Sequence, residues 1–336
     1  MNRRWLAVAI LLIVPISGSY ADDSAPLDVT QDGVVAFIDE MVTEHGFDAE
    51  SLRATLSEAR VQQSIIDKIS RPAERRLSWG DYRKIFITRE RIAAGTTFWL
   101  ENRAMLERIY RETGVPAEMI VGIIGVETYY GRITGKDRVL DALATLAFHY
   151  PPRAKFFRRQ LVEFLILARE EELDPTEPMG SYAGAMGKPQ FMPSSFRAYA
   201  VDATGDGKRD IWNNWADVAG SVANYFVEHG WRSGEQVVAQ ATLGHAWNGS
   251  APEAKNKLSA KDTVAALSGK GVMFATDLPD QSKGELLTFE TANGKEHWVG
   301  FHNFFVITKY NRSSMYALAA YQLGREIAGK VAKHAG

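Results

Sequence analysis

The stretch that decides the fold covers residues 115–132 and reads VPAEMIVGIIGVETYYGR. Pro116 has the fixed φ angle that suits the start of a helix, and Glu118 is favoured near the positive end of the helix dipole. Apolar residues recur at positions 120, 123 and 124, and the next position of this helical stripe is Glu127. A carboxylate therefore stands where a core side chain is expected.

Burial of the Glu127 side chain would change its acidity. A low-dielectric environment disfavours the charged form of a carboxyl group, raises its pKa and makes it a proton donor near neutral pH. Tyr129 and Tyr130 follow directly, and aromatic faces beside an acid commonly hold sugar rings. The pattern alone leaves a structural interpretation open, in which Glu127 caps a neighbouring helix or pairs with Arg132.

A second stretch, SYAGAMGKPQFMP at residues 181–193, breaks the helical periodicity. It mixes glycine and proline with polar and aromatic residues, and loops of this kind often line functional sites. The alternative is a tight turn between two core helices.

A third stretch, DATGDGKRDIWN at residues 202–213, resembles an EF-hand loop, with a glycine at position six. An asparagine replaces the bidentate glutamate at position twelve, which predicts weak binding of Ca²⁺ or a monovalent ion such as Na⁺. The alternative is an Asx-rich turn that binds no ion. The candidate ligands are Asp202, Thr204, Asp206, Lys208, Asp210 and Asn213.

Composition excludes several classes of function. Of 336 residues, 46% are hydrophobic and 24% are charged, as in soluble globular proteins. The net charge of −2 provides no basic field for nucleic acid. The chain lacks cysteine, which excludes disulfides and a lipid-modified cysteine.

The first 21 residues have the charged, apolar and small-residue parts of a secretory signal peptide. The apolar part is too short for a permanent membrane helix. We therefore expect a periplasmic protein without a permanent membrane anchor, and Arg3-Arg4 leaves both the general secretory and the twin-arginine route open.

Periodicity predicts a mainly helical chain with one β-rich part. Residues 92–110 are predicted to form one long helix, residues 306–311 an extended run, and Asn293-Gly294 the turn of a β-hairpin. The predicted organisation is a signal peptide at 1–21, a helical domain at 22–115, a core with the cation loop at 116–235, a small β-rich module at 236–305, and a strand and helix at 306–336 that return to the core.

Other catalytic motifs do not fit the sequence. The seven histidines form no HExxH motif, so a zinc site is disfavoured. The serine in GSYAG at 180–184 is displaced from the centre of a nucleophile elbow, and no phosphate-binding or dinucleotide-binding fingerprint is present.

Five segments in one order, 125–131, 181–196, 202–212, 220–226 and 309–317, closely resemble the lytic murein transglycosylase B family. The resemblance spans most of the predicted mature chain. It implies a mainly α (α+β) fold with a lysozyme-like helical core, an N-terminal helical domain and a small β-rich domain. It also implies cleavage of the β-1,4 bond between N-acetylmuramic acid and N-acetylglucosamine in peptidoglycan, with formation of 1,6-anhydro-N-acetylmuramic acid.

The resemblance further implies a mechanism with one acid and no required cofactor. Glu127 would protonate the leaving oxygen and then, as a carboxylate, deprotonate the C6 hydroxyl that attacks the anomeric carbon. The substrate's acetamido oxygen would act as the second nucleophile, and Ser181 matches a family serine that orients this group. The residues that match the lining of the family's groove are Tyr82, Gln190, Tyr310, Asn311 and Tyr316, and packing or capping roles remain open for each.

The expected partner is the glycan strand of peptidoglycan, together with penicillin-binding proteins or other wall enzymes. Two alternatives remain at this stage. One is a hydrolytic muramidase of the same fold, and the other is a non-catalytic glycan-binding scaffold for wall enzymes. Many members of the family carry a lipid anchor, which this sequence cannot have without cysteine.

Overall fold

The computed structural model describes residues 24–70, 77–247, 249, 253–254 and 258–335. The predicted signal peptide at 1–21 lies outside this range. Within the described range, no helix combines the length and the apolar character needed to cross a bilayer. The chain forms two compact units, each assembled from separate stretches: the first from residues 77–130 and 219–335, and the second from residues 24–70 and 131–218.

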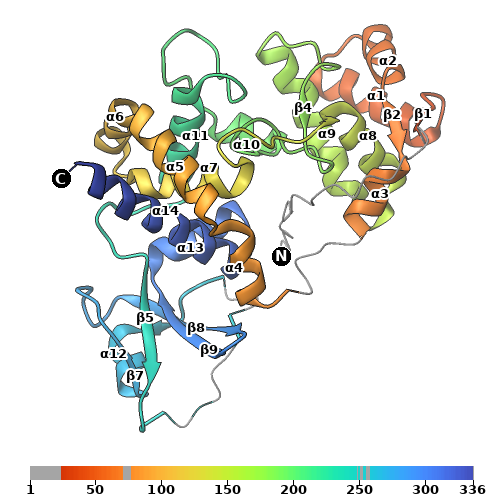
Figure 1. The fold of residues 1–336 in the computed structure, drawn as a ribbon. Coiled ribbons are helices and arrows are strands. Elements are labelled where there is room, and N and C mark those ends of the chain that lie inside the picture. The colour runs from red at the N-terminus through yellow and green to blue at the C-terminus, as the bar shows by residue number, and fades with distance from the viewer. Residues whose placement is uncertain (1–23, 71–76, 248, 250–252, 255–257, 336) are drawn as a thin grey trace. The chain divides into compact units, whose positions relative to one another are not determined.

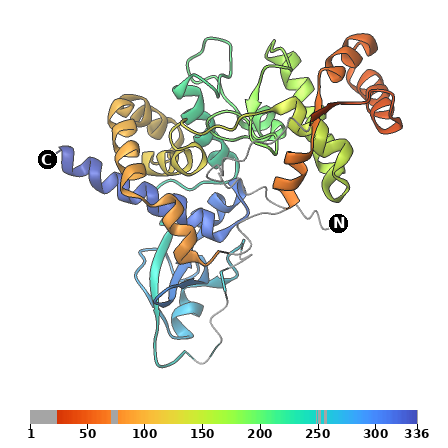
Figure 2. The same ribbon diagram turned by 45° about the vertical axis from the view of Figure 1, so that its right-hand side comes forward.

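Helix α7 (Ala117–Thr128) is the central helix of the first unit, and its residues from Met119 to Thr128 are all buried. Pro116 lies directly before it as the N-cap. Helix α14 (Ser314–Ala335) packs along α7, with α5 (Arg89–Glu101) against both, and Figures 1 and 2 agree on this arrangement. A helix that is apolar around its circumference requires such neighbours on every side. The other helices of this unit are α4 (Trp79–Phe86), α6 (Arg103–Thr113), α11 (Trp215–Glu228) and α13 (His302–Tyr310). Only residues 219–228 of α11 belong to this unit.

The β-rich part of the first unit is a five-stranded sheet of order β6-β8-β9-β5-β7. The predicted hairpin is confirmed, because Thr291 pairs with Gly294 where β8 turns into β9 (Figure 1). Helix α12 (Val264–Gly269) packs against β7 and β8. The strands are β5 (Val238–Leu243), β6 (Asp262–Thr263), β7 (Val272–Phe274), β8 (Lys283–Thr291) and β9 (Gly294–Gly300).

In the second unit, helices α8 and α9 form a packed pair, with α10 against α9. Two short antiparallel pairs, β1 with β2 and β3 with β4, tie distant parts of this unit together. The elements are β1 (Ser24–Pro26), α1 (Asp32–His45), α2 (Ala49–Ser57), β2 (Arg60–Gln62), α3 (Gln63–Ser70), β3 (Asp137–Arg138), α8 (Val139–His149), the 3₁₀ turn η2 (Pro151–Arg153), α9 (Ala154–Glu170), β4 (Met179–Gly180) and α10 (Pro193–Tyr199).

The mainly α prediction with a small β module is confirmed, but two local predictions are wrong. The predicted helix at 92–110 ends at Asn102, whose side-chain amide donates to the carbonyl of Phe98 at 2.8 Å and competes with continuation of the helix. The predicted extended run at 306–311 is the end of helix α13. Val306 and Ile307 are both buried there, and the strand preference of β-branched residues yields readily to tertiary packing.

Candidate active site

Glu127 lies in the last turn of α7 and is 8% exposed, so the burial predicted from the apolar stripe is confirmed. The hydroxyl of Tyr316, in the first turn of α14, donates to Oε1 of Glu127 at 2.5 Å. Burial, and then the charge of Glu127, raise the pKa of Tyr316 well above its usual value. Tyr316 therefore stays protonated at physiological pH and remains a hydrogen-bond donor to the acid.

Tyr310 and Asn311 end α13 beside this pair. The Tyr310 ring is stacked parallel to that of Tyr316, with centroids 6.5 Å apart, and its pKa is raised by burial and then by the charge of Glu127. Asn311 is 6% exposed, and its Oδ1 has no hydrogen-bond partner within the described residues. A buried polar oxygen of this kind is suited to accept a hydrogen bond from a ligand.

The backbone after α7 takes an unusual conformation. Tyr129 and Tyr130 both have positive φ angles, 52° and 58°, which is rare for residues other than glycine and stores strain. The Arg91 guanidinium lies 4.6 Å from the centroid of the Tyr129 ring and donates to the carbonyl of Gly125 at 2.6 Å. This buried cation therefore contacts the carbonyl end of the helix that carries Glu127 and fixes the tyrosine that follows it.

Tyr82 lies in α4 and is fully buried. Its ring packs on Phe86, with centroids 5.1 Å apart, and on Trp79, at 6.4 Å. An ionised Tyr82 would also raise the pKa of Tyr316, after the larger effects of burial and Glu127. The first unit thus gathers Glu127, Tyr82, Tyr129, Tyr310, Asn311 and Tyr316.

Ser181 and Gln190 lie in the loop of the second unit that connects β4 to α10. Ser181 is 4% exposed, and its Oγ accepts the N–H groups of Ala183 and Ala185 at 3.3 and 3.1 Å. These two bonds do not consume the hydroxyl proton of Ser181. The Gln190 amide donates to the carbonyls of Thr134 and Gly187 at 3.0 and 2.9 Å, which fixes the fold of the loop.

The 202–213 loop is organised around Asp202, whose carboxylate accepts backbone N–H groups from four residues, 204 to 207. The fully buried Asp217 accepts the N–H groups of Ala203 and Asp210, both at 2.9 Å, and so closes the loop. Burial, and then the charges of Asp202 and Asp206, raise the pKa of Asp217. Oxygen ligands and mutually repelling carboxylates fit a hard cation.

Sequence reasoning missed Arg91 and Asp217. Arg91 lies 34 residues before Gly125, its hydrogen-bond acceptor, and no local pattern signals that contact. Asp217 lies four residues beyond the end of the EF-hand-like motif, so the spacing of the motif does not include it. A second acidic group, Glu40, Glu44 and His45, has ligand atoms close together in α1, but acidic groups near the surface commonly bind no ion.

Comparisons with known proteins agree over most of the chain. A family model described as "Transglycosylase SLT domain" matches residues 30–325. Membrane-bound lytic murein transglycosylase B of Escherichia coli (strain K12) is 43% identical over 301 residues, which are 87% of this chain and 81% of that protein.

Two solved structures have the same architecture. Soluble lytic transglycosylase SltB1 from Pseudomonas aeruginosa is 50% identical, with 88% of this chain and 98% of that chain covered and a TM-score of 0.83. Escherichia coli lytic transglycosylase Slt35 in complex with calcium is 42% identical, with 92% and 97% covered and a TM-score of 0.82.

Proposed function

The chain belongs to the lytic murein transglycosylases of the SLT family, and we propose that Glu127 cleaves the β-1,4 bond between N-acetylmuramic acid and N-acetylglucosamine with formation of a 1,6-anhydro end. The fold is the mainly helical, lysozyme-like fold of these enzymes with a small β module. The observation that carries the proposal is the burial of Glu127 against the protonated Tyr316 hydroxyl.

The proposed reaction uses Glu127 twice. As an acid it gives its proton to the leaving O4 of N-acetylglucosamine while the C1–O4 bond breaks. As a carboxylate it then takes the proton of the C6 hydroxyl of the muramic residue, and that oxygen forms the new bond to C1. The acid regains its proton, so no water and no cofactor is consumed.

The acetamido group of the muramic residue is proposed to stabilise C1 between these two steps, as in substrate-assisted glycosidases. Ser181 is proposed to orient this group, because its hydroxyl proton is not consumed by the two loop bonds that it accepts. Asn311 Oδ1 is proposed to accept from a sugar hydroxyl or amide, while Tyr82, Tyr129, Tyr310 and Gln190 shape the sites around the glycan.

Product analysis of purified peptidoglycan sacculi tests the proposal directly. Mass spectrometry of the released fragments is expected to find 1,6-anhydro-muramoyl ends. Reducing ends in their place would indicate a hydrolytic muramidase, and intact glycan would indicate a non-catalytic scaffold. Either result would overturn the proposal.

Tyr316→Phe is expected to lower kcat about tenfold, because it removes one hydrogen bond to a charged group. The lost hydroxyl donates to Oε1 of Glu127, and because such a donor stabilises a carboxylate more than a carboxylic acid, its removal favours the protonated form. The alkaline limb of the pH–rate profile, which reports loss of the Glu127 proton, should therefore move to higher pH. Tyr321→Phe in the same helix is the matched control, and an equal change there, or an unmoved profile in Tyr316→Phe, would contradict this role.

The 202–213 loop is proposed to bind Ca²⁺ or, more weakly, Na⁺ through Asp202, Thr204, Asp206, the carbonyl of Lys208, Asp210 and Asn213. Support comes from the oxygen-rich ligand set and from the repulsion that a cation would relieve at Asp217. The ion is proposed to stabilise the loop and to take no part in the reaction.

Ca²⁺ at several times the dissociation constant of a weak site is expected to raise the melting temperature by about 2–5 °C. Asp206→Asn should abolish this shift. Glu44→Gln is the matched control, because Glu44 belongs to the acidic group in α1, and that variant should keep the shift. A shift that persists in Asp206→Asn would place the ion elsewhere.

Export to the periplasm through residues 1–21 is proposed from the sequence pattern alone. There the enzyme would meet peptidoglycan together with penicillin-binding proteins or other wall enzymes. Fractionation of cells that express the full chain tests the location, and retention in the cytoplasm would overturn it.

A further inference from the structure

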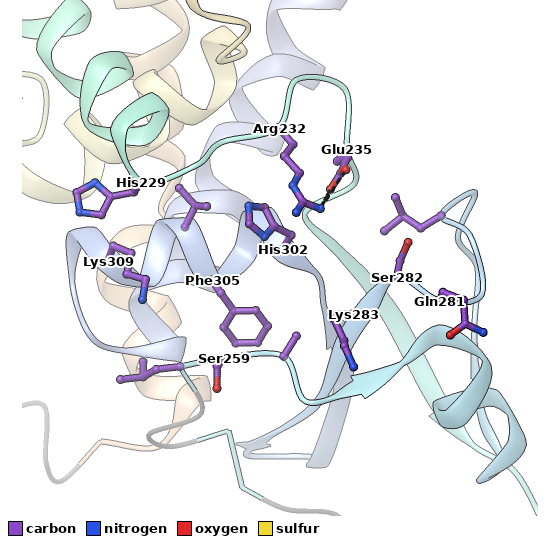
Figure 3. A pocket seen from close by; sticks show the side chains of 14 residues that line it. His229, Arg232, Glu235, Ser259, Gln281, Ser282, Lys283, His302, Phe305 and Lys309 are labelled. Atoms are coloured by element: carbon purple, nitrogen blue, oxygen red, sulfur yellow. Dashed lines mark hydrogen bonds and ion pairs between the residues drawn. The ribbon is translucent and has the colours of Figure 1, made fainter. Parts of the chain in front are cut away.

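A pocket of about 500 Å³ lies in the first unit, bordered by the end of α11, the length of α13 and the start of β8 (Figure 3). Its apolar floor includes Phe305 and Val306, which are 7% and 2% exposed. In the view of Figure 3, the Phe305 ring projects between Lys309 and Lys283. The volume is within the range of pockets that hold small ligands.

The charges around this pocket are predominantly positive. Among the described lining residues, the permanent cations are Arg232, Lys283 and Lys309, and the carboxylate is Glu235. Glu235 pairs with Arg232 at 3.4 Å, as the dashed line in Figure 3 shows. The two exposed lysine amino groups therefore give the pocket its excess positive charge, which favours an anionic ligand.

Two imidazoles add further polar atoms to the wall. His302 donates from Nε2 to the carbonyl of Gly230 at 2.6 Å, which fixes the orientation of its ring. His229 stacks on Tyr225, with centroids 4.1 Å apart, and burial lowers its pKa, so it is neutral at physiological pH. The anion-binding capacity therefore resides in the two lysines.

The pocket and the catalytic tyrosines share one turn of the chain. Lys309 directly precedes Tyr310, and the hydroxyl of Tyr225 donates to the Lys309 carbonyl at 2.7 Å. The Tyr225 and Tyr310 rings are in contact, with centroids 4.8 Å apart. A ligand that binds Lys309 would therefore sit beside the residues that surround Glu127.

We propose that this pocket binds carboxylates of the peptide stem carried by the muramic residue. The inference rests on the proposed function, which places a muramic residue at Glu127. The stem is attached to that sugar, and its side-chain and terminal carboxylates are free where the peptide is not cross-linked. Carboxylates would pair with Lys283 and Lys309, while the apolar parts of the peptide would pack on Phe305.

Calorimetric titration with the synthetic stem tripeptide L-alanyl-γ-D-glutamyl-diaminopimelate tests this pocket without any need for cleavage. The double variant Lys283→Gln/Lys309→Gln is expected to bind the tripeptide about tenfold more weakly than the wild type, because two charge-assisted contacts are lost. Lys295→Gln is the matched control, since this exposed lysine of the same sheet does not line the pocket. Equal affinity in the double variant, or an equal loss in the control, would overturn the proposal.

Two further measurements distinguish a peptide site from a general anion site and test the pocket during glycan cleavage. Inorganic phosphate at matched concentration should bind more weakly than the tripeptide, and equal binding of the two would identify a general anion site and overturn the peptide assignment. With peptide-bearing glycan as the substrate, the double variant should have a higher KM than the wild type and the same kcat. With glycan from which an amidase has removed the stem peptides, KM and kcat should both equal those of the wild type. A wild type that binds tripeptide but cleaves neither glycan would refute the proposed function and leave the pocket assignment standing.

Discussion

Glu127→Gln is expected to reduce glycan cleavage by about a thousandfold or more while the fold and glycan binding are kept. General acid–base catalysis contributes about 10²–10⁴ in rate, and here one residue is proposed to perform both proton transfers. Glutamine has nearly the same shape, and its side-chain carbonyl oxygen can still accept the hydrogen bond that Tyr316 donates to Oε1. The loss should therefore appear in kcat, measured by release of anhydro-muropeptides from sacculi.

The matched control is Glu118→Gln, which makes the same change in the first turn of the same helix. Glu118 pairs with Arg325 at 3.3 Å near the surface, and a pair of that kind contributes at most about 1 kcal/mol. Its turnover should stay close to that of the wild type. If Glu127→Gln retained wild-type turnover with an unchanged melting temperature, Glu127 would not be the acid.

Gly324→Ala is expected to destabilise the first unit by about 2 kcal/mol or more, the upper part of the range for overpacking a core. A Cβ atom at position 324 would lie 2.0 Å from the carbonyl oxygen of Glu118, and one at Gly122 would lie 2.3 Å from the carbonyl oxygen of Ala320. Both obstacles are backbone atoms, so α7 and α14 must move apart. Thermal unfolding should show a lower midpoint.

Gly329→Ala is the matched control in the same helix, because a Cβ atom there meets nothing within 4 Å. It should stabilise the protein by up to about 1 kcal/mol through the better helix propensity of alanine. If Gly324→Ala lowers the free energy of unfolding and Gly329→Ala raises it, close helix packing at position 324 is the cause. A change in the same direction in both variants would contradict this explanation. Gly324→Ala should also lower kcat, because α7 carries Glu127 and α14 carries Tyr316.

The predictions that succeeded depend on short-range patterns. The stripe at 120, 123 and 124 places Glu127 on a buried face because a helix repeats every 3.6 residues, and the structure confirms its burial. The Asn293-Gly294 turn predicted its hairpin for a similar reason, since turn geometry demands particular residues. The EF-hand-like spacing predicts a cation loop at 202–213, which stays a prediction, and Asp217, which closes this loop by accepting two of its N–H groups, lies beyond the motif.

The two failures have different causes, one a local side-chain hydrogen bond and the other tertiary packing. Asn102 ends a helix that apolar periodicity would continue. The run at 306–311 begins with the β-branched residues of a strand, but residues 306–310 belong to α13, where Val306, Ile307 and Thr308 are buried. Local propensities differ by about 1 kcal/mol or less per residue, and burial of a large apolar side chain outweighs that difference.

The sequence by itself determined the class of fold, the burial of one acid on an apolar helix and, through its resemblance to a family, the candidate residues around that acid. Only the tertiary structure decided that Tyr316, 189 residues away, donates to that acid, that Arg91 contacts the end of its helix, and that Gly122 and Gly324 let two helix backbones touch. The physical reason is one of range. Helical and strand periodicity are local properties of the chain, whereas a hydrogen bond or a close backbone contact depends on how separate elements pack.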